Sequence, residues 1–92
     1  MISSTEKLTR ICGSWERRQI SIPYLAAGLD QVLEETRDEF DVDTAGEALR
    51  IWGVIEIINA SILDENRKAS PEEMRELDRL VEKFRNLVGE HL

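Results

Sequence analysis

One apolar stretch, from Ala45 to Leu63, constrains the fold more than any other part of the chain. Between positions 51 and 63 its only polar side chains are Glu56, Asn59 and Ser61. The stretch lacks the alternation of a strand and is too long for one ordinary strand. A helix that is apolar around most of its circumference must be enclosed by neighbouring elements or by a partner. The rest of the chain must therefore supply that cover.

Three amphipathic segments flank this stretch, and helix-capping patterns mark where the helices begin. In a capping box, the side chain of an N-cap serine or threonine accepts a hydrogen bond from the amide of the third helical residue. A glutamate at that third position accepts a hydrogen bond from the N-cap amide in return. Three pairs fit this pattern: Ser3 with Glu6, Thr44 with Glu47, and Ser70 with Glu73. Ser21 before Pro23 is typical of an N-cap with proline in the first turn. The predicted helices cover residues of about 4–19, 22–40, 44–64 and 71–88, and Gly89 caps the last.

The 92-residue chain is predicted to form one all-α domain, residues 1–92. Four helices of comparable length with short connectors favour antiparallel neighbours, so we expect an up-down-up-down four-helix bundle. Two long helical hairpins that dimerise are the alternative. Helical spacing on the third helix predicts a core face that includes Ala48, Ile51, Ile55, Ile58 and Ile62, extended by Trp52 and Leu63.

Gly53 lies in the middle of the third predicted helix, where glycine costs about 1 kcal/mol relative to alanine. Gly46, Gly53 and Ala60 are spaced seven apart and form one stripe that another backbone can approach closely. We expect the second helix to cover this stripe with its small residues at 26–28. The alternative is a homodimer or a partner helix, for which Ile57, at the edge of the polar face, is the test position.

Negative charge is concentrated at one end of the predicted bundle. The formal net charge is −7, and positions 30–47 carry eight acidic residues against one arginine. Negative charge near a helix C-terminus is unfavourable, because that end of the helix dipole is itself negative. Helix stability therefore explains only part of this pattern. We interpret the cluster as a patch that meets a basic protein surface, with a plain solvated surface as the alternative. The candidate partner-binding residues are Glu34, Glu35, Asp38, Glu39, Asp41 and Asp43.

The opposite end of the predicted bundle collects four basic residues from the first and third connectors, namely Arg17, Arg18, Arg67 and Lys68. Four bases without nearby aromatic residues are a weak nucleic-acid footprint, and the overall charge repels phosphate. We therefore expect neither a nucleic-acid nor a membrane partner.

Few residues are suited to catalysis or metal binding. Cys12 is the only cysteine and shares an apolar helical face with Leu8 and Trp15, so we expect a buried thiol. His91 is the only histidine and lies next to the C-terminus. Acids and glycine at 41–46 resemble the start of a calcium loop, but Trp52 occupies the twelfth position, where a glutamate is needed. We expect no catalytic residue, no metal site and no cofactor.

These features predict a small acidic protein-binding module, without enzymatic activity, that occupies a basic surface of a partner protein. No leader or membrane span is apparent, so a cytoplasmic location is expected. Immunity proteins and antitoxins that neutralise basic toxins are similar in size and charge. A homodimeric structural or regulatory bundle is the second hypothesis. A small carboxylate-based enzyme or ligand binder is the third, and it requires a pocket near Glu56 and Asn59.

Overall fold

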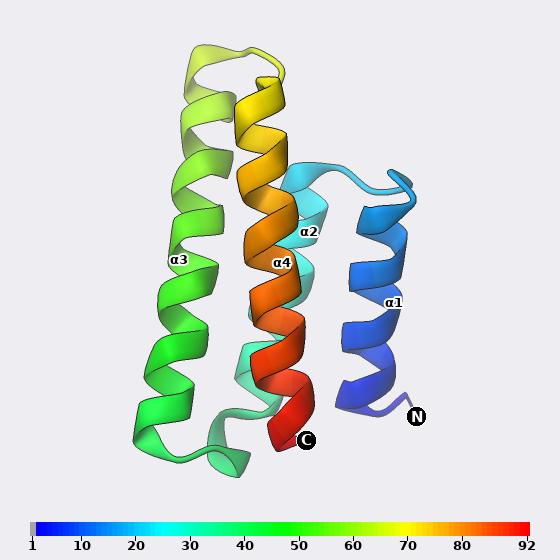
Figure 1. The fold of residues 1–92 in the computed structure, drawn as a ribbon, viewed down its shortest axis with the longest axis vertical. Coiled ribbons are helices and arrows are strands. Elements are labelled where there is room, and N and C mark those ends of the chain that lie inside the picture. The colour runs from blue at the N-terminus through cyan, green and yellow to red at the C-terminus, as the bar shows by residue number, and fades with distance from the viewer. Residues whose placement is uncertain (1) are drawn as a thin grey trace.

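Four α-helices account for most of residues 2–92, the part of the chain that the computed structural model describes. They are α1 (Ser4–Glu16), α2 (Ile22–Glu35), α3 (Val42–Glu65) and α4 (Pro71–His91), with a short 3-10 helix, η1 (Arg37–Glu39), between α2 and α3. The helices run alternately up and down, and each packs against two neighbours: α1 and α3 both lie against α2 and α4 (Figure 1). The predicted all-α, up-down-up-down four-helix bundle is confirmed.

Most helix starts follow the predicted capping residues. The hydroxyl groups of Ser3 and Ser21 accept hydrogen bonds from backbone amides three residues later. Ser70 and Glu73 form a complete capping box, with distances of 3.1 Å from the Glu73 amide to Oγ and 2.9 Å from the Ser70 amide to Oε1. Local hydrogen bonds of this kind need only a few neighbouring residues, which is why the sequence reveals them.

The predicted cap of α3 at Thr44 is wrong. The helix begins at Val42, and Asp41 is the N-cap, because its carboxylate accepts a hydrogen bond from the Thr44 amide at 3.0 Å. Thr44 lies inside the first turn and is buried against the bundle. Aspartate and threonine are both good N-cap residues. Because the Thr44 side chain is buried against the bundle, Asp41 takes the N-cap position instead.

Several predicted helix ends also differ from the structure. α1 stops at Glu16 rather than near residue 19, because Arg18 has a left-handed backbone with φ of 57°. α2 ends at Glu35, and η1 rather than α2 leads toward Phe40. α4 continues through the predicted Gly89 cap to His91, whose ring contacts that of Phe40 edge-on, with the ring centres 6.2 Å apart.

The helices are unequal in length, contrary to the prediction. α3 and α4 have 24 and 21 residues, whereas α1 and α2 have 13 and 14. At a rise of about 1.5 Å per residue, the longer pair exceeds the shorter by roughly 10–15 Å. Figure 1 shows the consequence: the α3–α4 hairpin extends beyond the connector between α1 and α2. One end of the bundle therefore has a step.

Side chains from all four helices form one continuous core. Its largest fully buried members include Trp15 and Phe84, and the Trp15 indole donates a hydrogen bond to Asp78 at 2.9 Å. Cys12 is fully buried, as predicted, and burial raises the pKa of its thiol to about 11. The predicted core face of α3 is mostly confirmed. Leu63 is the exception, because it is 58% exposed and does not belong to the core.

An ion pair joins the α3–α4 connector to the first turn of α4. The Arg67 guanidinium contacts Glu73 at 2.6 Å and also binds Glu65 at 2.7 Å. The hydrogen bond from Arg67, together with that from the Ser70 amide, lowers the pKa of Glu73 to about 2. The capping carboxylate is therefore ionised in the folded protein well below its ordinary pKa.

This pairing predicts an acid-dependent loss of stability. Because the folded-state pKa of Glu73 lies below the ordinary glutamate value of 4.5, its contribution to stability is full above about pH 4.5 and declines as pH falls toward about 2. Glu73→Gln should unfold at lower urea concentration than the wild type at pH 7, and the difference should shrink by pH 2–3. Glu72→Gln, with the same change in charge one residue away, is the control. Equal pH profiles for both variants would contradict the assignment.

Candidate functional site

The acidic residues singled out from the sequence lie together at one end of the bundle. Glu34 and Glu35 belong to the last turn of α2, Asp38 and Glu39 to η1, and Asp41 and Asp43 to the start of α3. The beginning of α1 and the end of α4 lie at the same end of the molecule (Figure 1). We call these six residues the acidic end.

Three members of the acidic end already have partners within the chain. Glu35 pairs with Lys7 of α1, and this hydrogen bond lowers the pKa of the carboxylate. Glu34 pairs with Arg37 at 2.8 Å. Hydrogen bonds from the side chain and amide of Thr44 lower the pKa of the capping Asp41. These carboxylates support the local fold.

The other three members, Asp38, Glu39 and Asp43, are exposed. None of the ion pairs formed within residues 2–92 involves them. Their charges therefore have no compensating base in the described chain. They are the acids most available to a partner.

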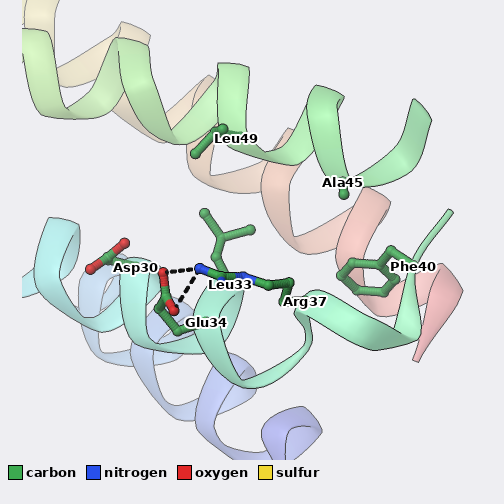
Figure 2. Close-up of a pocket in the computed structure, with 7 residues that line it drawn as sticks. All are labelled: Asp30, Leu33, Glu34, Arg37, Phe40, Ala45 and Leu49. Carbon is green, nitrogen blue, oxygen red and sulfur yellow. Dashed lines mark hydrogen bonds and ion pairs between the residues drawn. The ribbon is translucent and has the colours of Figure 1, made fainter. Parts of the chain in front are cut away.

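An apolar hollow of about 140 Å³ lies beside the acidic end, between α2 and α3 (Figure 2). Leu33 and Leu49 approach it from the two helices, and Phe40 closes one side. The Glu34–Arg37 ion pair and Asp30 lie along its edge. The hollow is wide enough for part of one side chain, and its apolar floor has charged groups of both signs at its edge.

Sequence reasoning missed this hollow. Leu49 is 56% exposed, and it falls on the outer side of α3, away from the predicted core face. An apolar residue outside the core stripe was the available signal. The signal was incomplete, because only the packing of α2 on α3 shows that Leu33 and Phe40 lie next to Leu49.

The glycine stripe of α3 faces outward. A Cβ atom added at Gly46 or Gly53 would have no neighbouring atom within 4 Å, and Ala60 is exposed. The expected cover by α2 is therefore wrong: Gly28 of α2 packs against Ile11 of α1 instead. Ile57, on the same outer side, is 69% exposed.

The predicted basic end is also present. Arg18, Arg67 and Lys68 all line one hollow between the α1–α2 connector and the α3–α4 hairpin. Arg18 pairs with Asp78 at 2.9 Å and stacks on the Trp15 ring at 4.9 Å, so its position is fixed. Arg17 instead donates a hydrogen bond to Gln19.

Glu56 and Asn59, the residues of the enzyme hypothesis, have different surroundings. Asn59 is buried and lines the hollow at the basic end. Glu56 is half-buried and is not among the residues that line this hollow. The structure therefore does not join these two side chains in one pocket there.

Residues 2–92 contain no group of three or more His, Cys, Asp or Glu side chains placed to hold a metal ion. Over the same residues, none of the helices has the length and apolar character needed to span a membrane. Comparisons of the chain with protein-family models, with curated proteins and with solved structures found no match.

Proposed function

We propose that this protein is a binding module whose acidic end occupies a basic surface of a partner protein. The observation that carries the proposal is the apolar hollow between Leu33, Phe40 and Leu49, which has Asp30 and Glu34 at its edge and lies in the same part of the bundle as the acidic end. Protein interfaces gain most of their affinity from a few anchors buried in pockets and surrounded by a polar rim. An apolar floor close to a group of exposed acids fits a partner segment that combines an apolar anchor with lysine or arginine.

The acids have different expected roles in this proposal. Asp38, Glu39 and Asp43 are exposed and form no ion pair within residues 2–92, so they provide steering and pairing groups. An incoming base at Glu34 or Glu35 must compete with Arg37 or Lys7, so these carboxylates contribute less. Electrostatic attraction between exposed groups is screened by salt, and the association rate should therefore fall as ionic strength rises.

The narrower form of the proposal is that the protein is a cytoplasmic immunity or antitoxin protein and that its partner is a basic, often nucleolytic, toxin. The net charge of −7 supports this form, because it complements a cationic partner. The protein would act by covering the basic surface, without catalysis and without binding nucleic acid or membrane itself.

The test compares two charge-reversal variants with equal changes in net charge. Co-purification from the native host identifies the partner, and surface plasmon resonance then measures its affinity. Asp38, Glu39 and Asp43 change to lysine in one variant, and Asp41 is left intact because it caps α3. Asp64, Glu72 and Glu82, exposed acids outside the acidic end, change to lysine in the control.

We expect the first variant to bind at least about tenfold more weakly, mainly through slower association, and the control to bind like the wild type. Leu49→Ala should instead speed dissociation, because it removes part of the hollow's wall. Circular dichroism checks that each variant is folded. Unchanged affinity of the captured partner for the first variant would refute the proposal.

A homodimer through the outer face of α3 is a second candidate. Large apolar side chains on this face are exposed: Val42 is 87% exposed and Ile57 is 69% exposed. Gly46 and Gly53 lie on the same face and are not covered by another element. Exposed apolar patches of this kind mark interaction surfaces. Sedimentation at micromolar concentrations should detect a dimer that Ile57→Glu dissociates. A monomer at every concentration would exclude this candidate.

A further inference from the structure

The step at the basic end of the bundle contains the largest hollow described, about 840 Å³ in volume. It forms where the α3–α4 hairpin extends past the connector between α1 and α2 (Figure 1). Ile20 and Ile22 line it from the connector side, and Ile62, Leu63 and Met74 line it from the hairpin. A wall of this kind suits an apolar ligand. The volume lies within the range of about 300–1,000 Å³ that is typical of small-molecule sites.

Two uncharged polar side chains, Ser21 and Asn59, interrupt the apolar wall. Asn59 of α3 is only 6% exposed and lines the hollow, and no group of the described chain donates a hydrogen bond to its Oδ1 atom. Buried polar atoms in native proteins are nearly always paired, because an unpaired one loses its hydration without compensation. The oxygen is itself shielded from solvent, so a donor in the hollow would reach it only after the Asn59 side chain rotates.

Of the basic residues that line the hollow, only one takes part in no ion pair within residues 2–92. Arg18, Arg67 and Lys68 line it, and no aspartate or glutamate does. Ion pairs fix both arginines, Arg18 through Asp78 and Arg67 through Glu65 and Glu73. Lys68 is exposed and takes part in no ion pair within residues 2–92. Its ammonium group is available to an anion at the entrance.

We propose that this hollow binds a small amphipathic organic anion. The apolar body of the ligand lies against the isoleucine side chains, an N–H or O–H group donates to Asn59 Oδ1, and the anionic group pairs with Lys68. This site is at the opposite end of the molecule from the acidic end, and it does not depend on the protein-binding proposal. The apolar body, the donor and the anionic group of the ligand each match one feature of the hollow.

The probe for the test is 8-anilinonaphthalene-1-sulfonate, because it combines aromatic rings, one N–H donor and one sulfonate. Its N-methylated derivative keeps the aromatic rings and the sulfonate but has a methyl group in place of the N–H donor. Titration followed by ¹⁵N–¹H correlation spectra should shift the Asn59 side-chain amide signal and the backbone signals of the lining residues. Dispersed spectra at every point ensure that the probe binds the folded protein. Calorimetry gives the dissociation constants.

Two variants and two matched controls separate this site from general dye binding. Asn59→Leu should weaken the probe about tenfold and abolish the difference between the probe and its N-methyl derivative. Lys68→Glu should weaken both compounds severalfold. Asn86→Leu and Lys83→Glu make the same changes on the exposed surface of α4 and should alter affinity less than about twofold.

Leu63→Glu provides a further variant if Asn59→Leu does not fold, since Leu63 is exposed on the rim and its replacement leaves the core intact. It should also weaken binding severalfold. The proposal is overturned if neither compound binds up to about 1 mM, so that water alone fills the hollow, or if the spectral shifts lie elsewhere. Equal effects of the variants and their controls would overturn it as well.

Discussion

Replacing Ile55 by alanine is expected to lower the free energy of unfolding by about 2–5 kcal/mol. Ile55 is fully buried in the middle of α3, where the bundle surrounds it. Its replacement removes the apolar contacts of the side chain and leaves a cavity that close-packed neighbours fill only in part. Urea denaturation, followed by circular dichroism and tryptophan fluorescence, measures the loss.

Ile57→Ala is the matched control, because the same substitution two residues later affects a side chain that is 69% exposed. Its effect on the free energy of unfolding of the monomer should stay within about 0.5 kcal/mol. Both proteins should be measured at low concentration, where self-association through the outer face of α3 is minimal. Similar losses for the two variants would show that α3 is rotated from the orientation described.

Leucine at two glycine positions is expected to have opposite effects. Gly28→Leu should destabilise the protein by about 1–3 kcal/mol through overpacking. The reason is that even a Cβ atom at Gly28 would lie 2.6 Å from Ile11 Cδ1, within the α1–α2 interface. Gly53→Leu should stabilise the protein by about 0.5–1 kcal/mol, since leucine favours the helix and a Cβ there has open space around it.

The melting temperatures of these two variants provide the measurement, and Gly53→Ala separates helix propensity from any new surface contact. Gly28→Leu combined with Ile11→Ala should recover part of the loss, because the smaller side chain makes room for the leucine. Destabilisation by Gly53→Leu in a monomer would mean that another element covers the glycine stripe.

Short-range patterns explain most of what could be predicted. The capping pairs at Ser3, Ser21 and Ser70 and the apolar spacing of each helix depend on residues within about one turn of each other. They therefore predicted the number of helices, the bundle and most of the core. The acidic end followed too, because adjacent segments 34–43 bring their own charges together. What these charges bind remains a proposal.

Other features depend on how separate helices meet, and no local pattern contains them. The sequence marked both Gly28 and Gly53 as close-packing positions, yet only Gly28 contacts another helix. Leu33 and Leu49 are far apart in the chain, and their hollow exists only because α2 packs on α3.

The sequence by itself determined the helical class, the core faces and the position of the acidic segment, because each depends on composition or on spacing between residues that are close in the chain. The tertiary structure alone decided which surface of each helix is covered and where hollows remain. Asn59 illustrates the difference. Helical spacing places it beside the core face, but only the extension of α3 and α4 past α1 and α2 leaves it in a hollow with its oxygen unpaired. Long-range packing sets that environment, since it depends on the relative lengths of all four helices.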